Sequence, residues 1–440
     1  MELGGACVMV VGLGASGNAA ARFLHSRGAK LVLTDRRVDI DRAKLPPATI
    51  YLGADQAEWL EGVDLVVASP GVPRGALLLC QAVARRIPVI SEVELASRFI
   101  AAPIAAITGT NGKSTVTVLL GEILRAAGMR VFVGGNLGTP LIEAVGGAYD
   151  AIVAEISSFQ LEWIERFRAH IGVHLNLTDD HFDRYRGLED YGRAKARLFE
   201  NQLESDWAIL NRDDPNVWKL ARAVRSTVIG FGLSPSVGRA AIWPDGSSLV
   251  FDIGERRGCI STDGFRLPGR HNLVNVMAAA AAALAMRVEP PVIERALGKF
   301  KGLPHRIEFV REKDGVSFID DSKGTNVGAV IEALEAMPGP VILIAGGLDK
   351  GGDYTPLIGP VKRKVRRMIL NGAARDKMAA ALDGATEIEL VSTLKEAVER
   401  ASRVARRGDT VLLSPACASF DQFRDYAERG GIYQELVRAL

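Results

Sequence analysis

Cysteine is scarce in this chain. The four cysteines stand at positions 7, 80, 259 and 417, far apart, and no two of them form a CxxC pair. This spacing argues against a zinc site and against a disulfide scaffold. It is consistent with a protein of the reducing cytoplasm.

An excess of charge of one sign and a long apolar run are also missing. Lysine and arginine number 54 against 52 aspartates and glutamates, so no broad field is available to hold a nucleic acid or an anionic membrane. The longest alanine-rich run, residues 277–286, is about half of the roughly 20 residues that a membrane-spanning helix needs. Residues 1–11 lack the basic start and the cleavage site of a signal peptide. We expect a cytoplasmic protein, a monomer, that contacts neither nucleic acid nor membrane.

The 440 residues are too many for one ordinary core, and strand-like runs alternate with helical stretches in three series. A segment with glycine and proline, residues 300–304, separates the second series from the third. We therefore expect an α/β protein with domains at residues 1–92, 93–302 and 303–440. The predicted strands are 7–11, 31–34, 65–68 and 89–90; 103–108, 131–133, 151–155 and 171–177, with a helix near 272–286; and 317–319, 341–345, 367–370 and 410–413.

The first strand leads into a glycine-rich turn. Residues 12–17 read GLGASG, a full GxGxxG at the start of a helix, and Asp35 ends the next strand. Such glycines allow a diphosphate to approach helix amides, and the acid can accept hydrogen bonds from a ribose or base. Taken alone, this motif indicates an NAD-dependent enzyme, and a purely structural glycine turn is the alternative.

A second glycine-rich loop is more specific. Residues 109–115 read GTNGKST, between a strand and a helix whose apolar residues at 116, 119, 120, 123, 124 and 127 share one face, with Gly128 ending the helix. Loop amides can surround phosphate oxygens, Lys113 can neutralise terminal phosphates, and Ser114 or Thr115 can reach a magnesium ion. Because Ile107 replaces the first glycine of GxxxxGK[ST], the match is partial.

Polar side chains follow several other strands. Glu155 ends strand 151–155, where a metal-binding carboxylate is expected beside a phosphate loop, although a solvated strand-end acid is the alternative. Residues 178–185 read TDDHFDRY, too polar and compact for a simple connection, although helix capping and turn formation are the alternative. Lys195 lies on the next helix, where a lysine is usually solvated. Similar clusters at 320–326, 346–351 and 414–420 predict the ligand-binding rim of a third sheet.

These residues, in this order, resemble the Mur ligase family. The loop GTNGKST is shared with folylpolyglutamate synthetases, whereas EISSFQLE at 155–162, DSKGTN at 321–326 and LSPACAS at 413–419 look like the member that adds D-glutamate. The resemblance implies a Rossmann-like UDP-binding domain, a central P-loop ATPase-like domain and a C-terminal Rossmann-like domain. It also implies that ATP activates UDP-N-acetylmuramoyl-L-alanine as an acyl phosphate, which D-glutamate attacks. The first glycine turn then becomes a UDP site, and NAD drops out.

The resemblance assigns roles residue by residue. The catalytic residues implied are Lys113, Glu155, His181 and Lys195. Magnesium, at two sites, is implied to lie at Ser114, Glu155, His181 and Lys195, with Lys195 carbamylated. The ATP site comprises Gly109, Thr110, Asn111, Gly112, Lys113, Ser114, Thr115, Asn272, Asn275, Arg306 and Asp321. The substrate contacts are Ser16, Asp35, Arg37, Asn136, Ser157, Gln160, His181, Lys323, Thr325, Lys350, Ser419 and Tyr426. The family often has Phe at the position of Tyr426 and Leu at that of Phe420, so the amino-acid pocket departs most from the pattern.

Three other functions share some of these motifs. A dehydrogenase has no use for GTNGKST, and a folylpolyglutamate synthetase has no need of the N-terminal GxGxxG domain. A nucleotide-gated regulatory protein could keep the loop and lose catalysis, yet the chain retains Lys113, Glu155, His181, Lys195 and Lys350. An intact set of reacting groups favours an enzyme, and we expect its C-terminal domain to close on the central one about residues 300–304.

Overall fold

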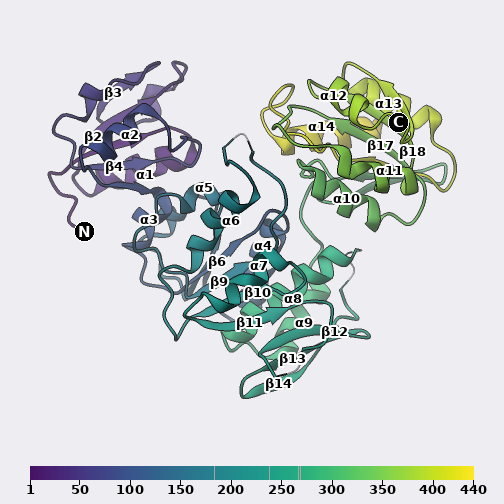
Figure 1. Cartoon of the computed structure of the whole chain (residues 1–440), viewed down its shortest axis with the longest axis horizontal. Coiled ribbons are helices and arrows are strands. Elements are labelled where there is room, and N and C mark those ends of the chain that lie inside the picture. Colours follow the sequence, from purple (N-terminus) through teal and green to yellow (C-terminus); the bar gives the residue numbers. More distant parts are fainter. Residues whose placement is uncertain (183, 237, 266, 268) are drawn as a thin grey trace.

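Three helix-covered sheets give the molecule three α/β domains (Figure 1). The structure is a computed structural model that describes residues 1–182, 184–236, 238–265, 267 and 269–440. In Figure 1 the central domain lies at the bottom, with the N-terminal domain above it on one side and the C-terminal domain on the other. The predicted fold class is confirmed, while the domain boundaries remain predictions. Asp183, part of the predicted polar cluster, lies outside the described residues.

The N-terminal sheet has five parallel strands in the order β3-β2-β1-β4-β5. Strand β1 lies between β2 and β4, so the turn after β1 is at the point where the strand order reverses, the usual ligand position in such sheets. The sequence did not predict β3. The elements are β1 (Cys7–Val11), α1 (Ala15–Ser26), β2 (Lys30–Asp35), β3 (Thr49–Leu52), β4 (Leu65–Ala68), α2 (Leu77–Ala84), β5 (Val89–Ser91) and α3 (Glu92–Ser97).

The central sheet has nine strands in the order β14-β13-β12-β11-β10-β9-β6-β8-β7, and only the β12-β13-β14 pairs are antiparallel. Strand β6 is central, and its phosphate loop therefore opens between β8 and β9. The elements are β6 (Ile104–Thr108), α4 (Lys113–Ala126), β7 (Val131–Gly135), β8 (Ala151–Glu155), α5 (Ser158–Leu161), β9 (Ile171–His174), α6 (Leu188–Ala196), β10 (Trp207–Asn211), α7 (Pro215–Trp218), β11 (Thr227–Phe231), β12 (Ala241–Asp245), β13 (Ser248–Ile253), β14 (Arg256–Ser261), α8 (Arg270–Ala285) and α9 (Pro290–Lys299).

Two predictions for the central domain are wrong in detail. Strand β9 ends at His174, not at residue 177, because after Leu175 the chain turns so that Asn176 can bind the phosphate loop. Helix α4 buries all its predicted apolar residues except Ala127, which is exposed because it caps the helix. Gly128, with φ +86°, ends the helix as predicted.

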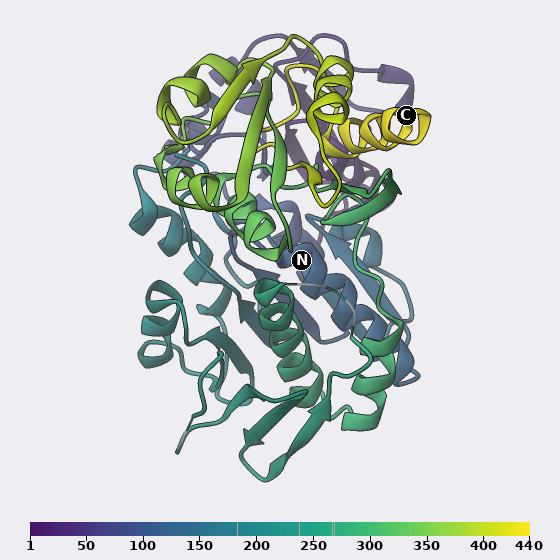
Figure 2. The same cartoon turned by 90° about the vertical axis from the view of Figure 1, so that its right-hand side faces the viewer.

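The C-terminal sheet has six strands in the order β15-β16-β20-β17-β18-β19, all parallel except β15. Figure 2 shows this domain above the central one, with the N-terminal domain behind it. The elements are β15 (Glu308–Lys313), β16 (Val316–Asp320), α10 (Val327–Ala336), β17 (Val341–Gly346), α11 (Ile358–Lys364), β18 (Val365–Asn371), α12 (Arg375–Ala381), β19 (Glu387–Leu390), α13 (Leu394–Val404), β20 (Thr410–Leu413) and α14 (Tyr426–Ala439).

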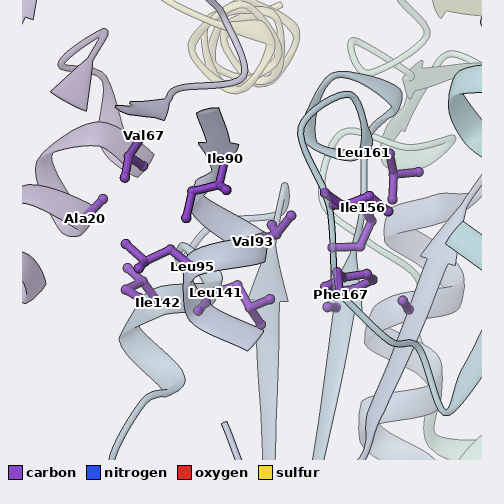
Figure 3. Close-up of a cluster of buried hydrophobic side chains, with 14 of the residues drawn as sticks. Ala20, Val67, Ile90, Val93, Leu95, Leu141, Ile142, Ile156, Leu161 and Phe167 are labelled. Atoms are coloured by element: carbon purple, nitrogen blue, oxygen red, sulfur yellow. The ribbon is translucent and has the colours of Figure 1, made fainter. Parts of the chain in front are cut away.

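The N-terminal and central domains share one hydrophobic core. Val67 and Ile90 of the first sheet, Val93 and Leu95 of α3, and Phe167 of the central domain belong to a single buried cluster (Figure 3). Continuous apolar packing of this kind resists relative motion of the two domains. Among the described residues, no helix combines the length and the apolar composition needed to cross a membrane.

Candidate active site

The phosphate loop connects β6 to α4 through two glycines with positive φ, Gly109 at +150° and Gly112 at +84°. A Cβ on Gly112 would lie 2.3 Å from Oδ1 of Asn275, which projects from α8. Only glycine fits this close approach in this conformation. The predicted ATP residue Asn275 is therefore placed directly against the loop.

Asn176 holds the loop and was missed by the sequence analysis. Its Oδ1 accepts hydrogen bonds from the backbone N–H groups of Thr110 (3.0 Å) and Asn111 (2.8 Å), and its Nδ2 donates to the carbonyl of Asn111 (3.1 Å). The only signal in the sequence is a polar residue between Leu175 and Leu177, next to the polar cluster.

Lys113, the first residue of α4, folds back over the loop. Its Nζ donates to the carbonyls of Gly109 (2.9 Å) and Thr110 (2.8 Å). Burial lowers the pKa of Lys113, while the charges of Glu155 and Asp180 act in the opposite direction. The buried hydroxyl of Thr115 has no hydrogen-bond partner among the described residues. A cation and an unused hydroxyl beside loop amides suit a phosphate group.

Ser114 and Glu155 form a buried pair of oxygen ligands. The Ser114 hydroxyl donates to Oε2 of Glu155 (2.6 Å), and Nδ2 of Asn136 donates to Oε1 (2.7 Å). Burial raises the pKa of Glu155, but the charge of Lys113 and these two hydrogen bonds outweigh burial, so the pKa lies below its ordinary value. A hydroxyl and an ionised carboxylate are the oxygen donors that Mg²⁺ prefers. Asn136 thus orients Glu155, and its predicted contact with the substrate stays a prediction.

Lys195 is not a solvated surface residue. Its side chain on α6 is buried, and its Nζ donates to the carbonyl of Gly109 (2.8 Å) and lies 4.5 Å from the ring centroid of Tyr191. Burial, together with the nearby charge of Lys113, brings the pKa of Lys195 well below its ordinary value. The structure thus brings Lys195 to the phosphate loop, where a neutral amine is favoured.

His181 and Asp180 lie between the phosphate loop and the C-terminal domain. His181 has φ +57°, and its ring packs edge-on against Phe159 (4.7 Å) and Tyr191 (6.0 Å). Burial lowers the pKa of His181 to about 4, so its imidazole is neutral at pH 7 and able to bind a metal. Burial opposes ionisation of Asp180, yet the charge of Lys350 and its hydrogen bond keep the pKa of Asp180 below the ordinary value.

The C-terminal domain completes this site from the opposite side. Nζ of Lys350 donates to Oδ1 of Asp180 (2.9 Å), and Nδ2 of Asn326 donates to Oδ1 of Asn111 (3.1 Å). The two domains enclose a cavity of about 330 Å³ lined by residues including His181, Thr325 and Lys350. Asp180 and Asn326 were quoted in the sequence motifs but not predicted as site residues.

Several other residues predicted to bind ATP or substrate do not line this cavity. Burial raises the pKa of Asp321 to about 7, although the hydrogen bond that its Oδ2 accepts from Ser414 and the charge of Arg306 both act to lower that pKa. Nζ of Lys323 lies 4.1 Å from the ring centroid of Tyr426. Ser419 is buried, and neither it nor Tyr426 lines the cavity. Asn272 is buried on α8.

The predicted UDP residues lie apart from this site, on the N-terminal domain. Asp35 accepts hydrogen bonds from the backbone N–H of Leu13 (2.7 Å) and from Arg37 (2.8 Å to Nη2), while Ser16 lies in the first turn of α1. The side chain of Asp35 therefore shapes the glycine turn. A Cβ on Gly17 would lie 1.9 Å from the carbonyl oxygen of Gly12, so that turn requires glycine.

Ser157 and Gln160 bind each other. The Ser157 hydroxyl accepts from the backbone N–H of Gln160, and Oε1 of Gln160 accepts from the backbone N–H of Ser157 (2.9 Å), which forms a capping box at the start of α5. This capping role is by itself sufficient to account for a serine at position 157 and a glutamine at position 160. Their predicted contact with substrate stays a prediction.

Comparison with known proteins identifies relatives along the whole chain. Family descriptions match in succession: "Mur ligase MurD-like, N-terminal domain" at residues 6–91, "Mur ligase middle domain" at 107–283 and "Mur ligase, glutamate ligase domain" at 305–417. A protein of Geotalea uraniireducens named UDP-N-acetylmuramoylalanine--D-glutamate ligase is 47% identical over 451 residues, covering 100% of this chain and 99% of its own. A protein of the same name from Pelotomaculum thermopropionicum is 46% identical, covering 98% and 97%.

Solved structures share the fold at lower identity. A pseudomurein peptide ligase type C from Methanothermus fervidus superposes with a TM-score of 0.62 at 19% identity, covering 99% of both chains. The UDP-N-acetylmuramate-alanine ligase MurC from Thermotoga maritima superposes with a TM-score of 0.61 at 17% identity, covering 98% of this chain and 99% of its own. From the matched domains and the full-length relatives, the chain belongs to the Mur ligase family.

Proposed function

We propose that this protein is an ATP-dependent ligase that adds D-glutamate to UDP-N-acetylmuramoyl-L-alanine, in cytoplasmic synthesis of the peptidoglycan precursor. The observation that carries the choice of substrates is the full-length similarity to ligases named for that reaction. The site supports it, because the phosphate loop is hydrogen-bonded through Asn111 to Asn326, which lines the same cavity as His181 and Lys350.

The chain's own residues account for the chemistry. A free carboxylate is a poor acyl donor, so ATP first phosphorylates the L-alanyl carboxylate, and the amine of D-glutamate then displaces phosphate through a tetrahedral intermediate. Lys113 offsets the charge that develops on the transferred phosphoryl group, a role that dominates catalysis of phosphoryl transfer. Magnesium, when bound, screens the phosphate oxygens, and Ser114 with Glu155 would hold it.

A second magnesium would use His181 and a carbamylated Lys195. A neutral lysine amine attacks carbon dioxide, forms an N–C bond and loses one proton. A side chain that is ordinarily a cation thereby becomes an anionic oxygen ligand. The burial of Lys195 and its lowered pKa support this reaction, because they favour the neutral amine. The neutral imidazole of His181 is the matching nitrogen ligand.

D-Glutamate would bind where Lys350 and Thr325 line the cavity. Its carboxylates need cationic and hydroxyl partners. Lys350 is engaged with Asp180 (2.9 Å), so an incoming carboxylate has to compete with Asp180 for the ammonium group. Lys323, Ser419 and Tyr426 remain the other predicted contacts.

The test is phosphate release from ATP with magnesium and UDP-N-acetylmuramoyl-L-alanine, comparing D-glutamate, L-glutamate, L-alanine and no amino acid. We expect release that depends on D-glutamate. Release with another amino acid would keep the family and change the substrate, while no release under any condition would favour a nucleotide-gated regulatory protein.

A further inference from the structure

The N-terminal domain reaches the central domain through the loop of residues 69–75, which follows β4. One side chain of the central domain, Arg184, binds the backbone of this loop. Its Nη1 donates to the carbonyl of Pro70 (2.9 Å) and its Nη2 to the carbonyl of Val72 (2.9 Å). No predicted role in catalysis or binding uses Arg184.

The guanidinium is fixed on its central-domain side as well. Its Nε donates to Oε1 of Glu162 (3.0 Å), its Nη2 donates to Oε2, and the group lies 4.2 Å from the ring centroid of Phe159. The Arg184 and Glu162 side chains are only 10% and 3% exposed, and the Tyr185 hydroxyl also donates to Glu162 (2.8 Å). A buried two-point pair of this kind holds the guanidinium plane in one orientation.

The same loop is tied to the glycine turn of the N-terminal domain. The Ser69 hydroxyl donates to the carbonyl of Gly12 (2.6 Å). A methyl group of Val72 lies 2.8 Å from the position that a Cβ on Gly12 would occupy. A displacement of the loop would therefore disturb the turn that is predicted to hold the UDP diphosphate.

On the other side, Arg184 is directly linked to His181. The backbone N–H of Arg184 donates to the His181 carbonyl (3.0 Å), and the Phe159 ring contacts both side chains. A path of direct contacts thus runs from Gly12 through Ser69 and the loop to Arg184 and His181. The loop also forms a wall of a groove of about 690 Å³, together with Phe159 and Tyr185.

We propose that Arg184 is a positioning residue that clamps the 69–75 loop to the central domain and thereby fixes the glycine turn of the predicted UDP site at a set distance from the phosphate loop. This inference rests on the proposed function. Because the substrate is held at its diphosphate end, its far end meets the phosphoryl group only if that distance is fixed. Small displacements of the reacting atoms from their near-attack geometry lower the rate strongly.

Arg184→Met removes the clamp and keeps an apolar stem against Phe159. We expect the KM for UDP-N-acetylmuramoyl-L-alanine to rise about tenfold or more, as for loss of a charge-assisted contact, with the KM for ATP changing by less than about twofold. Arg184→Lys should not restore the KM, because one ammonium nitrogen cannot reproduce a planar fork. Lysine also keeps the charge, so it serves if the methionine variant is poorly folded.

Arg197→Met is the matched control. Arg197 donates to the carbonyls of Leu161 (2.8 Å), Glu162 (2.6 Å) and Ile164 (2.7 Å), all within the central domain. It should lower thermal stability at least as much as the Arg184 variants without a selective rise in the KM for the muramoyl substrate.

Hydrogen–deuterium exchange of the substrate-free protein tests the clamp independently of turnover. Exchange in the peptide that contains residues 69–75 should rise in Arg184→Met and Arg184→Lys and stay at the wild-type level in Arg197→Met. If the wild type has no D-glutamate-dependent activity, the proposed function fails while this exchange still tests the clamp. Unchanged loop exchange, or equal changes in KM for both substrates, would overturn the inference.

Discussion

At the scale of single residues, Lys195 carries the most specific chemistry. Its amine is buried against the Gly109 carbonyl, and its pKa lies well below the ordinary value because of burial and of Lys113. We expect enzyme in buffer stripped of carbon dioxide to lose activity at least about 10- to 100-fold, because the loss of even a group that only orients a metal ligand typically costs this much. Bicarbonate should restore the activity, and native mass spectrometry should find one added carbon dioxide.

Lys195→Arg is the control for that prediction. Arginine keeps the positive charge but has no amine that reacts with carbon dioxide. The activity of the Lys195→Arg enzyme should therefore be low and should not change when bicarbonate is added. A Lys195→Ala enzyme with full activity would refute a role for the carbamate altogether.

Residue chemistry was only partly predictable from the sequence. The type and order of Lys113 and Ser114 identify a phosphate site, because one loop brings them together, and Glu155 could be added because it ends a strand of the same predicted sheet. The burial of Lys195 could not be predicted, since a lysine on a polar helix is usually solvated, and resemblance alone singled it out. Asn176 was missed because its role depends on how β9 ends beside β6, which no local pattern encodes.

At the scale of elements, helix α3 joins two domains with two buried glutamates of opposite behaviour. Glu92 accepts a hydrogen bond from the Ile142 backbone (2.6 Å), its other oxygen has no partner in the described part of the chain, and burial raises its pKa to about 7. Glu94 accepts backbone hydrogen bonds from Glu165, Arg166 and Phe167 (2.7–2.9 Å). These bonds and one from Arg98 outweigh the effect of burial and lower the pKa of Glu94.

The two glutamates therefore affect stability in opposite directions. Between pH 4.5 and about 7, Glu92 is protonated in the folded protein but ionised in the unfolded chain, so its contribution is complete below pH 4.5 and is lost as pH rises through about 7. Glu94 contributes above pH 4.5, and its contribution is lost as pH falls through its lowered folded-state pKa.

Substitution of each glutamate by glutamine tests this difference. At pH 8, Glu92→Gln should stabilise the protein by about 1 to 3 kcal/mol, because it removes a buried charge, and the gain should shrink at pH 5. Glu94→Gln should destabilise by about 1 to 3 kcal/mol at pH 8, because it loses charge-assisted bonds. Urea unfolding followed by tryptophan fluorescence at both pH values measures the changes, and the same sign for both variants would contradict the assignment.

Elements were predicted best where their residues are buried on both faces. The predicted bounds are correct for the central parallel strands β1, β4, β8 and β20. A short apolar run rich in β-branched residues fits a buried strand better than a helix or a loop. The β12-β13-β14 extension was not predicted, since its outer strands are half polar and resemble loops. Strand β3, also missed, is an edge strand with no fully buried residue.

At the scale of the whole molecule, sequence alternation predicted three domains but not how they meet. The N-terminal and central domains share a continuous core (Figure 3). The central and C-terminal domains instead meet through polar contacts such as Lys350 with Asp180 and Asn326 with Asn111. Polar interfaces of this kind permit domain motion, so movement is expected between the second and third domains and not between the first and second.

The Lys350–Asp180 ion pair gives that motion a test. The side chains of the pair are 23% and 9% exposed, so the pair is partly buried and salt weakens it only in part. Lys350→Met should increase the radius of gyration of the ligand-free protein in small-angle scattering at low salt. Lys377→Met is the control, because the ion pair of Lys377 with Asp349 (2.7 Å) lies within the C-terminal domain.

Salt and ligands then separate the sources of compaction. High salt should expand the wild type toward the Lys350→Met value and leave that variant little changed, since the screened pair is already absent. An ATP analogue with the muramoyl substrate should compact both proteins, because new contacts across the cavity replace the ion pair. If the wild type and Lys350→Met scatter identically at low salt, the pair does not hold the domains together, and closure depends on the asparagine contacts and the ligands alone.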